Sequence, residues 1–267
     1  MKPAPTSSHP GVTVLEARRL TLDYVTETGS VRAVEDVSFT VAKGERLVLL
    51  GPSGCGKSTI LKAIAGFIRP TEGHVFLEGQ AVSKPGPDRL VVFQEFDQLL
   101  PWKTVRENVA FPLTVARGKS KGEARRIADQ ALAKVGLTRA LDAYPRELSG
   151  GMKQRAAIAR ALAAAPDVLL MDEPFAALDA LTRTALQNDL LDLANDLNFT
   201  LVFVTHAIEE AVLLGTRLHL LSAHPGRTLA TFDTTRFGRD SVGTPAFRDI
   251  VRNINMTLFG GATGAAA

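Results

Sequence analysis

The sequence is poor in cysteine and in long apolar runs, and each shortage excludes a class of protein. Its 267 residues include one cysteine, Cys55, so no internal disulfide can form and no oxidising compartment is required. The apolar runs at 47–50, 168–171 and 201–204 are far shorter than the about 20 residues that span a bilayer. Residues 1–8 lack the apolar segment of a secretory signal, and we expect a loose tail there.

Neither positive nor negative charge is in large excess. The 31 Lys and Arg residues nearly balance the 28 Asp and Glu residues, for a net charge of +3, and the basic residues are scattered along the chain. This pattern does not indicate a nucleic-acid-binding protein, although weak attraction to an anionic membrane surface stays open. With 45% hydrophobic and 22% charged residues, the composition is that of an ordinary globular protein.

A glycine-rich loop follows the apolar run at 47–50. It matches the pattern G-x-x-x-x-G-K-[ST], in which backbone N–H groups surround phosphate oxygens while the lysine and the hydroxyl reach phosphate and Mg²⁺. A strand before the loop and a helix from about Ser58 to Gly66 after it provide the required context, because the positive end of the helix then points at the phosphates. The motif predicts a nucleoside triphosphate bound by Gly51, Pro52, Ser53, Gly54, Cys55, Gly56, Lys57, Ser58 and Thr59.

The remaining pattern predicts an α/β fold. Short alternating segments at 12–17, 37–41 and 74–77 indicate an antiparallel β lobe, and about 95–165 is helical and polar. Within that helical part, residues 120–123 predict a capping box, and residues 149–151 lie at the start of a helix over 152–163. We expect a tail at 1–11, a main domain at 12–230 and a short helical extension and tail at 231–267, with a helix between Thr244 and Gly260.

Polar residues follow several apolar strands, where a parallel sheet places its ligand-binding groups. Asp172 is expected to hold Mg²⁺, and Glu173 to orient and deprotonate the water that attacks the γ-phosphate. Gln94 and His206 also follow apolar runs, and each is either a contact to phosphate, metal or water or a satisfied surface group. Tyr24, ahead of the phosphate loop, either stacks on adenine or simply packs.

In their order along the chain, these motifs resemble the ATP-binding subunit of an ABC transporter. The resemblance covers about 12–227 and is carried by the phosphate loop, Gln94, Asp172, Glu173, Asp179, His206 and a specific segment that other phosphate-loop ATPases lack, namely Leu148, Ser149, Gly150, Gly151 and Met152. It implies an ABC-type ATPase with a RecA-like parallel-sheet core, an N-terminal antiparallel β lobe and a helical signature subdomain.

The resemblance also implies a working pair and a role for each motif. Two subunits would sandwich two ATP molecules head to tail, each held by one phosphate loop and the other subunit's residues 149–151. Tyr24 would stack the adenine, Gln94 would link Mg²⁺ and water to the partner, Asp179 would lie at the dimer seam, and His206 would contact the γ-phosphate. The metal set would be Ser58, Gln94 and Asp172. Met152 stands where the family most often has glutamine, and Ala207 where aspartate is common.

Residues 94–105 and 224–227 are similar to the importer branch that serves nitrate, sulfonate and taurine. That branch implies transmembrane permease subunits, a separate extracytoplasmic solute-binding protein, and a peripheral position on the cytoplasmic face of the inner membrane. Contacts to a cytoplasmic helix of the membrane subunit are then expected from Phe96, Leu99, Leu100 and Trp102. The alternative for Trp102, the only tryptophan, is a place in the core.

Three other functions stay open at this point. One is an ABC-type ATPase outside transport, although the sequence lacks the long coiled coil or second cassette that such proteins usually carry. Another is uptake of a different small solute. A third is a phosphate-loop kinase, which would leave the segment at 148–155 unexplained.

Overall fold

The computed structural model describes residues 11–26 and 29–260, which form two compact units. One unit combines Met1–Pro85 with Phe199–Ala267, and the other is Gly86–Asn198. The predicted tail at 1–11 lies outside the described residues except for Gly11. The chain therefore leaves the first unit once and returns to it.

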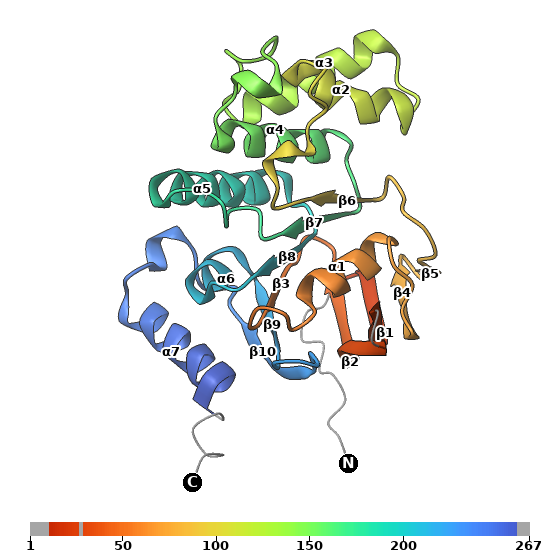
Figure 1. Cartoon of the computed structure of the whole chain (residues 1–267). Coiled ribbons are helices and arrows are strands. Elements are labelled where there is room, and N and C mark those ends of the chain that lie inside the picture. The colour runs from red at the N-terminus through yellow and green to blue at the C-terminus, as the bar shows by residue number, and fades with distance from the viewer. Residues whose placement is uncertain (1–10, 27–28, 261–267) are drawn as a thin grey trace. The chain divides into compact units, whose positions relative to one another are not determined.

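The first unit contains the predicted antiparallel lobe. Strands β1 (Thr13–Thr26), β2 (Gly29–Ala42), β4 (Glu72–Leu77) and β5 (Gln80–Ala81) pair in the order β2-β1-β4-β5 (Figure 1). The two long strands change register at several points, and Arg19 and Asp36 near these irregularities have positive φ angles. Such bulges bend and twist a strand, so β1 and β2 run on as one ribbon well past the short segments that alternation predicts.

A second sheet of the first unit carries the parallel strands. It contains β3 (Arg46–Leu50), β8 (Leu201–Thr205), β9 (Arg217–Leu221) and β10 (Thr228–Asp233), with β3 parallel to β8 and β9 and with β10 antiparallel to β9. The strand β8 is buried throughout, as expected of a parallel strand with both faces covered. Helix α1 (Lys57–Ala65) contacts β8, α6 (Ile208–Leu214) contacts β3, and α7 (Pro245–Phe259) packs on α6.

The second unit is mainly helical. It contains α2 (Val105–Val115), α3 (Lys121–Lys134), α4 (Gly150–Ala163) and α5 (Ala180–Leu197), together with the parallel pair β6 (Arg89–Val92) and β7 (Val168–Asp172). Helices α2, α3 and α4 pack against one another (Figure 1). Short 3-10 turns at η1 (Phe96–Gln98) and η2 (Pro145–Glu147) lead into α2 and α4.

Polar side chains start most of these helices. Ser149 and Thr244 accept from the backbone N–H groups of Met152 and Phe247, which satisfies donors that a helix start leaves unpaired. At the predicted capping box, Ser120 Oγ accepts from Glu123 N, while the Glu123 carboxylate pairs with Lys119. A reciprocal capping box forms instead at Thr104 and Glu107, where α2 begins.

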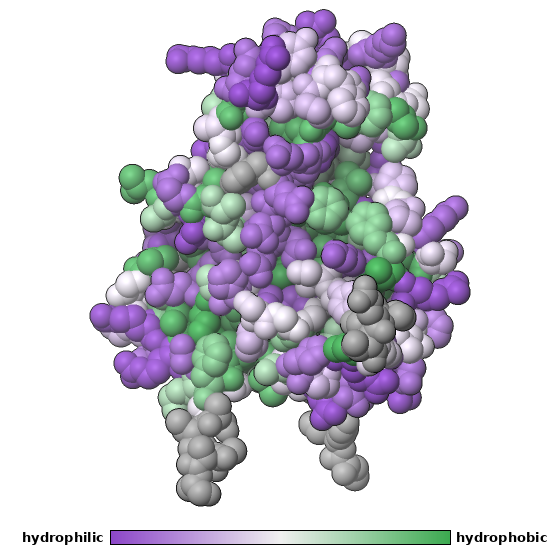
Figure 2. All heavy atoms as spheres, viewed as in Figure 1, coloured by the Kyte–Doolittle hydropathy of each residue, from purple (hydrophilic) through white to green (hydrophobic). Residues whose placement is uncertain are grey.

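The surface is polar on the face seen in Figure 2, where hydrophilic side chains predominate and apolar ones form separate groups. Among the described residues, none of the helices combines the length and the apolarity that a membrane crossing requires. Apolar side chains left open to solvent include Trp102, Val115 and Phe67. One of these, Trp102, belongs to a segment that the sequence singles out.

Candidate functional site

The phosphate loop, 51–58, joins β3 to α1 in the first unit. Gly54 and Gly56 have φ angles of +79° and +90°, a region that side chains disfavour, and this allows the chain to coil tightly before the helix. Lys57 is only 4% exposed, and its Nζ donates to the carbonyl oxygens of Gly51 (2.9 Å) and Pro52 (3.0 Å). These bonds hold the ammonium group against the loop, where a phosphate-binding cation is needed.

Tyr24 and His206 lie in the same unit as the loop. The Tyr24 hydroxyl shares a hydrogen bond with Thr59 Oγ1 of α1, and the residue remains 42% exposed, so part of its side chain is open to a ligand. Because Leu50 of β3 pairs with Thr205 of β8 in a parallel register, Gly51 and His206 leave the sheet at the same edge. Both residues are therefore placed at the loop's end of this sheet.

Gln94, Asp172 and Glu173 belong to the second unit and leave their strands together. Val92 of β6 pairs with Met171 of β7, so Gln94 and the Asp172–Glu173 pair follow at one edge of the two parallel strands. Glu173 has a φ angle of +45°, which is uncommon for a residue other than glycine and turns the chain sharply after β7. Left-handed non-glycine residues of this kind cluster at active sites and ligand clamps.

The segment 148–152 forms the start of α4. Leu148 is buried, Ser149 is exposed and caps the helix, and Gly150 and Gly151 are its first residues. A Cβ atom on Gly151 would lie 2.6 Å from Thr182 Cγ2 of α5, so glycine permits this close helix packing. The exposed helix start offers N–H groups and a positive dipole end to an anion.

Asp179 caps α5 beside that contact. Its Oδ1 accepts from Thr182 N at 3.0 Å, and this backbone hydrogen bond, followed by one with the Thr182 side chain, lowers the pKa of the Asp179 carboxyl. Arg183 donates to the carbonyl oxygens of Phe175 and Leu178. Asp179 and Arg183, at the start of α5, thus fix the end of the chain that runs from Glu173 to this helix.

The segment that follows Gln94 is tied to two helices. Gln98 Nε2 donates to Gln154 Oε1 (3.4 Å), and Arg160 Nη1 donates to Gln98 O (2.7 Å), which fastens the segment to α4. Asn108 of α2 is fully buried and binds the turn at 100–104: it accepts from Leu100 N and donates to the carbonyl oxygens of Leu100, Lys103 and Thr104.

That turn decides between the two interpretations of Trp102. The side chain of Trp102 is 70% exposed, so it is not part of the core. Leu99 is only 3% exposed, so its place among the expected partner contacts is wrong: its side chain is buried within this chain. Leu100 is partly exposed, and the side chain of Phe96 lies outside what the structure describes.

Replacing Asn108 by alanine is expected to lower the free energy of unfolding by about 2–4 kcal/mol, because it leaves several buried backbone groups without partners. Urea unfolding of the parent and the variant measures the difference. The matched control is Asn253→Ala in α7, an exposed position where we expect a change within about 0.5 kcal/mol. Equal losses in both variants would contradict the role of Asn108.

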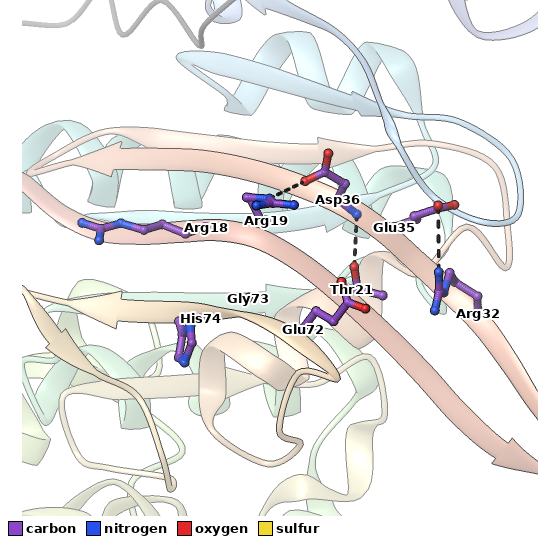
Figure 3. Close-up of a pocket in the computed structure, with 9 residues that line it drawn as sticks. All are labelled: Arg18, Arg19, Thr21, Arg32, Glu35, Asp36, Glu72, Gly73 and His74. Atoms are coloured by element: carbon purple, nitrogen blue, oxygen red, sulfur yellow. Dashed lines mark hydrogen bonds and ion pairs between the residues drawn. The ribbon is translucent and has the colours of Figure 1, made fainter. Parts of the chain in front are cut away.

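A polar hollow of about 500 Å³ lies on the antiparallel sheet and is lined by residues of β1, β2 and β4 (Figure 3). Its three arginines, Arg18, Arg19 and Arg32, are matched by three carboxylates, Glu35, Asp36 and Glu72. Arg19 pairs with Asp36 and Arg32 with Glu35. These six side chains carry no net charge together, so the hollow lacks the excess positive charge that attracts phosphates.

Sequence reasoning missed several residues that hold the motifs in place. Asn108, Arg160 and Arg183 contact backbone carbonyls that the motif patterns do not mention. For Arg160 and Arg183 no sequence signal was present, because a surface arginine in a helix is unremarkable in sequence. Asn108 breaks the apolar pattern of its helix, which is the one signal that pointed to a buried polar role.

The donor set suits ATP and a hard cation. In the first unit, the loop supplies N–H groups, an ammonium group and the hydroxyl of Ser58, which are the groups that phosphate loops offer to phosphate and Mg²⁺. In the second unit, Gln94 and Asp172 carry amide and carboxylate oxygens, the atom type that Mg²⁺ prefers. Within 11–26 and 29–260, no three His, Cys, Asp or Glu side chains gather into a metal site.

Comparison with known proteins indicates the same family as the sequence motifs. The family model described as ABC transporter matches residues 34–176. The chain is 47% identical to the nitrate import ATP-binding protein NrtD of Synechococcus elongatus, over 77% of this chain and 75% of that protein. It is 46% identical to the bicarbonate transport ATP-binding protein CmpD of Synechocystis, over 81% of this chain and 77% of that protein.

A solved structure also resembles the fold. The dimeric ATP-binding cassette MJ0796, in a post-hydrolysis state bound to ADP and Pi, superposes with a TM-score of 0.71 at 32% identity, covering 82% of this chain and 98% of that one. The α/β cassette fold expected from the sequence is confirmed. The chain belongs to the ABC transporter family and is one of its ATP-binding, ATP-hydrolysing cassettes.

Proposed function

We propose that this chain is the ATPase subunit of an importer for a small anion such as nitrate, bicarbonate, a sulfonate or taurine. The observation that carries the proposal is the 47% identity with a nitrate import subunit over three quarters of both chains. A bicarbonate transport subunit is similar to nearly the same degree. Both relatives serve small oxyanions, so we infer the same chemical class of cargo here.

In this function each motif has one task. Residues 51–59 bind the phosphates of ATP, with Lys57 as the cation, and Tyr24 offers its exposed side chain to the adenine. Ser58, Gln94 and Asp172 would hold Mg²⁺, and the ion would neutralise charge on the phosphates. Glu173 acts as general base toward the attacking water, and His206 contacts the γ-phosphate.

The helix start at 149–151 would act on a second subunit's nucleotide. Ser149 is exposed, and the first N–H groups of α4 are available to an anion. The dimeric cassette that this fold resembles supports a paired arrangement. In such a pair, Leu148 and Met152 would flank the contact and Asp179 would lie at its seam. We infer a head-to-tail pair of this chain or of this chain and a similar ATPase subunit.

The membrane partners would be permease subunits served by a separate extracytoplasmic binding protein, with this chain on the cytoplasmic face of the inner membrane. The exposed Trp102 supports such docking, because tryptophan is enriched among residues that anchor interfaces. Asn108 binds the backbone of Leu100 before Trp102 and of Lys103 after it, so the turn that carries the indole is held on both sides. Phe96, Leu100 and Trp102 remain as candidate contacts.

Trp102→Ala is expected to reduce co-purification with a membrane protein by at least about tenfold while leaving ATP affinity unchanged, since an interface tryptophan often carries more than 1.4 kcal/mol. Affinity capture from detergent-solubilised membranes, with identification of the bound proteins, measures this. Val115→Ala is the matched control, because Val115 is also 70% exposed and lies in the same unit.

Three outcomes would contradict all or part of the proposal. Capture of no membrane protein by the parent chain would favour an ABC-type ATPase outside transport. A captured permease whose reconstituted complex takes up a different small solute would keep the ATPase role and replace the anion. Loss of capture in Val115→Ala as well would remove Trp102 from its special place.

A further inference from the structure

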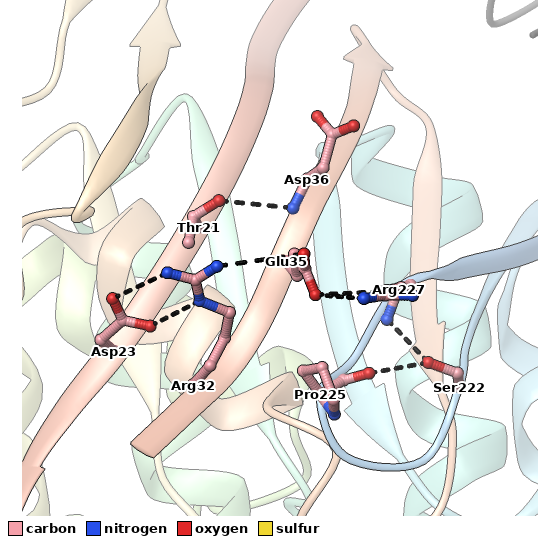
Figure 4. A network of polar contacts seen from close by, with 8 residues as sticks. All are labelled: Thr21, Asp23, Arg32, Glu35, Asp36, Ser222, Pro225 and Arg227. Carbon is pink, nitrogen blue, oxygen red and sulfur yellow. Dashed lines mark hydrogen bonds and ion pairs between the residues drawn. The ribbon is translucent and has the colours of Figure 1, made fainter. Parts of the chain in front are cut away.

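The loop 222–227 joins β9 to β10 and lies along strand β2 (Figure 4). Gly226 N donates to Ala33 O at 2.8 Å, and Gly226 O accepts from Glu35 N at 2.9 Å, so Gly226 forms a parallel bridge with Val34. The loop also closes on itself, because Ser222 Oγ donates to Pro225 O and accepts from Arg227 N. The N–H and the carbonyl group of Gly226 are therefore both hydrogen-bonded to the backbone of β2.

Gly226 lies directly against the phosphate loop. A Cβ atom on Gly226 would lie 2.1 Å from Cys55 O, a distance that no real structure tolerates. The φ angle of Gly226 lies outside the left-handed region, so the requirement for glycine comes from space and not from backbone conformation. The carbonyl of Cys55 thus rests on the bare backbone of Gly226.

This contact fixes the direction of a phosphate-binding group. In a planar trans peptide, the carbonyl oxygen and the following N–H point in opposite directions. With Cys55 O facing Gly226, Gly56 N–H faces away from the loop 222–227. Gly56 lies equally close to β2, since a Cβ there would lie 2.4 Å from Val34 Cγ2 and 2.9 Å from Ala33 O. We call the surface formed by Ala33, Val34 and Gly226 the wall. The wall therefore orients the whole Cys55–Gly56 peptide.

A chain of ion pairs holds the wall together (Figure 4). Arg227 donates to Glu35 Oε2 through Nη2 (2.5 Å) and Nε (3.0 Å), and Arg32 lies 3.9 Å from the other oxygen of Glu35. Arg32 in turn donates to Asp23 of β1 at 3.0 Å. The pair between Glu35 and Arg227 flanks the backbone bridge at Gly226 and fastens the loop 222–227 to β2.

We propose that Gly226 is a positioning residue for nucleotide binding, and that the Arg227–Glu35 ion pair keeps it in register. Gly226 touches no phosphate itself; it sets the Cys55–Gly56 peptide so that Gly56 N–H can donate to one. The proposal rests on the nucleotide site proposed above. It adds the loop after β9, far from the glycine motif in sequence, to the parts that determine phosphate affinity.

The test compares Gly226→Ala with Gly238→Ala. Gly238 has extended backbone and nothing within 4 Å of a Cβ, which makes it the matched control in the same unit. Gly226→Ala is expected to weaken Mg-ATP and inorganic tripolyphosphate by the same factor, about tenfold or more, because a phosphate hydrogen bond is lost. The ¹H–¹⁵N resonance of Gly56 should move in this variant and stay in place in Gly238→Ala.

A second series keeps the proposal testable if Gly226→Ala does not fold. Arg227→Ala is expected to weaken tripolyphosphate about threefold, and Arg227→Lys to restore it, because lysine can still reach the single Glu35 oxygen that Arg227 uses. Parent-like affinity in Gly226→Ala, or in Arg227→Ala, would overturn the proposal. Failure of the parent itself to bind Mg-ATP would instead overturn the nucleotide site.

Discussion

Glu173→Gln should lower ATP turnover by about two to four orders of magnitude, the span usual for a lost general base. The amide keeps the size of the carboxylate but cannot take a proton from water, so Mg-ATP affinity should stay near the parent value. Phosphate release and equilibrium nucleotide binding, measured on the same preparation, separate the two effects. Retention of near-normal phosphate release would remove Glu173 from the role of base.

Two variants frame that result. Glu209→Gln changes an exposed glutamate of α6 in the same way and should leave turnover unchanged. Lys57→Ala should instead weaken the binding of Mg-ATP by about tenfold to a hundredfold, because it deletes a charge-assisted contact to the phosphates.

In scattering experiments Glu173→Gln with Mg-ATP should accumulate as a dimer. Only single molecules, even with the membrane partner supplied, would contradict the proposed pair.

His219 should make the protein lose stability in mild acid. This histidine lies in β9, where its Nε2 contacts Thr228 Oγ1 and its ring lies 5.3 Å from that of Phe39. Burial, together with the nearby positive charge of Arg217, lowers the pKa of His219 to about 4. The native state therefore holds the ring neutral, whereas the unfolded chain protonates it near its ordinary pKa of 6.5.

The sign follows from proton binding. Between pH 6.5 and 4 the unfolded state binds more protons at this site, so the free energy of unfolding falls as the pH falls. The contribution of His219 is fully present above pH 6.5 and should shrink by about 2 kcal/mol between pH 7 and pH 5. Urea unfolding at the two pH values should show this loss in the parent and not in His219→Gln. Equal losses in both would contradict the assignment.

Local signals in the sequence were sufficient for much of the fold. The apolar run at 47–50 and the glycine loop behind it predict β3 and the start of α1, and Thr244 and Gly260 bound α7 as expected. Ser149 caps α4 where its position predicts. In each case the pattern lies within a few residues, so hydrogen bonds and burial along the element itself determine the outcome.

Other features depend on contacts that no local pattern carries. Leu99 and Trp102 are three residues apart and both apolar, yet Leu99 is buried and Trp102 is exposed. Gly226 reads as a turn glycine, but its requirement comes from Cys55, more than 150 residues earlier in the chain. The left-handed backbone of Glu173 is likewise imposed by its surroundings, since glutamate has no preference for it.

The hydrogen bonds around Asn108 give the second unit a mechanical property. They join the Trp102 turn to α2, and Arg160 joins the preceding residues to α4, whose opposite end begins at Gly150. Arg160 lies ten residues along from that end, about 15 Å at the rise of an α-helix. A displacement of the Trp102 indole would thus be transmitted through hydrogen-bonded segments and along α4 to the N-terminal end of that helix, which Ser149 caps.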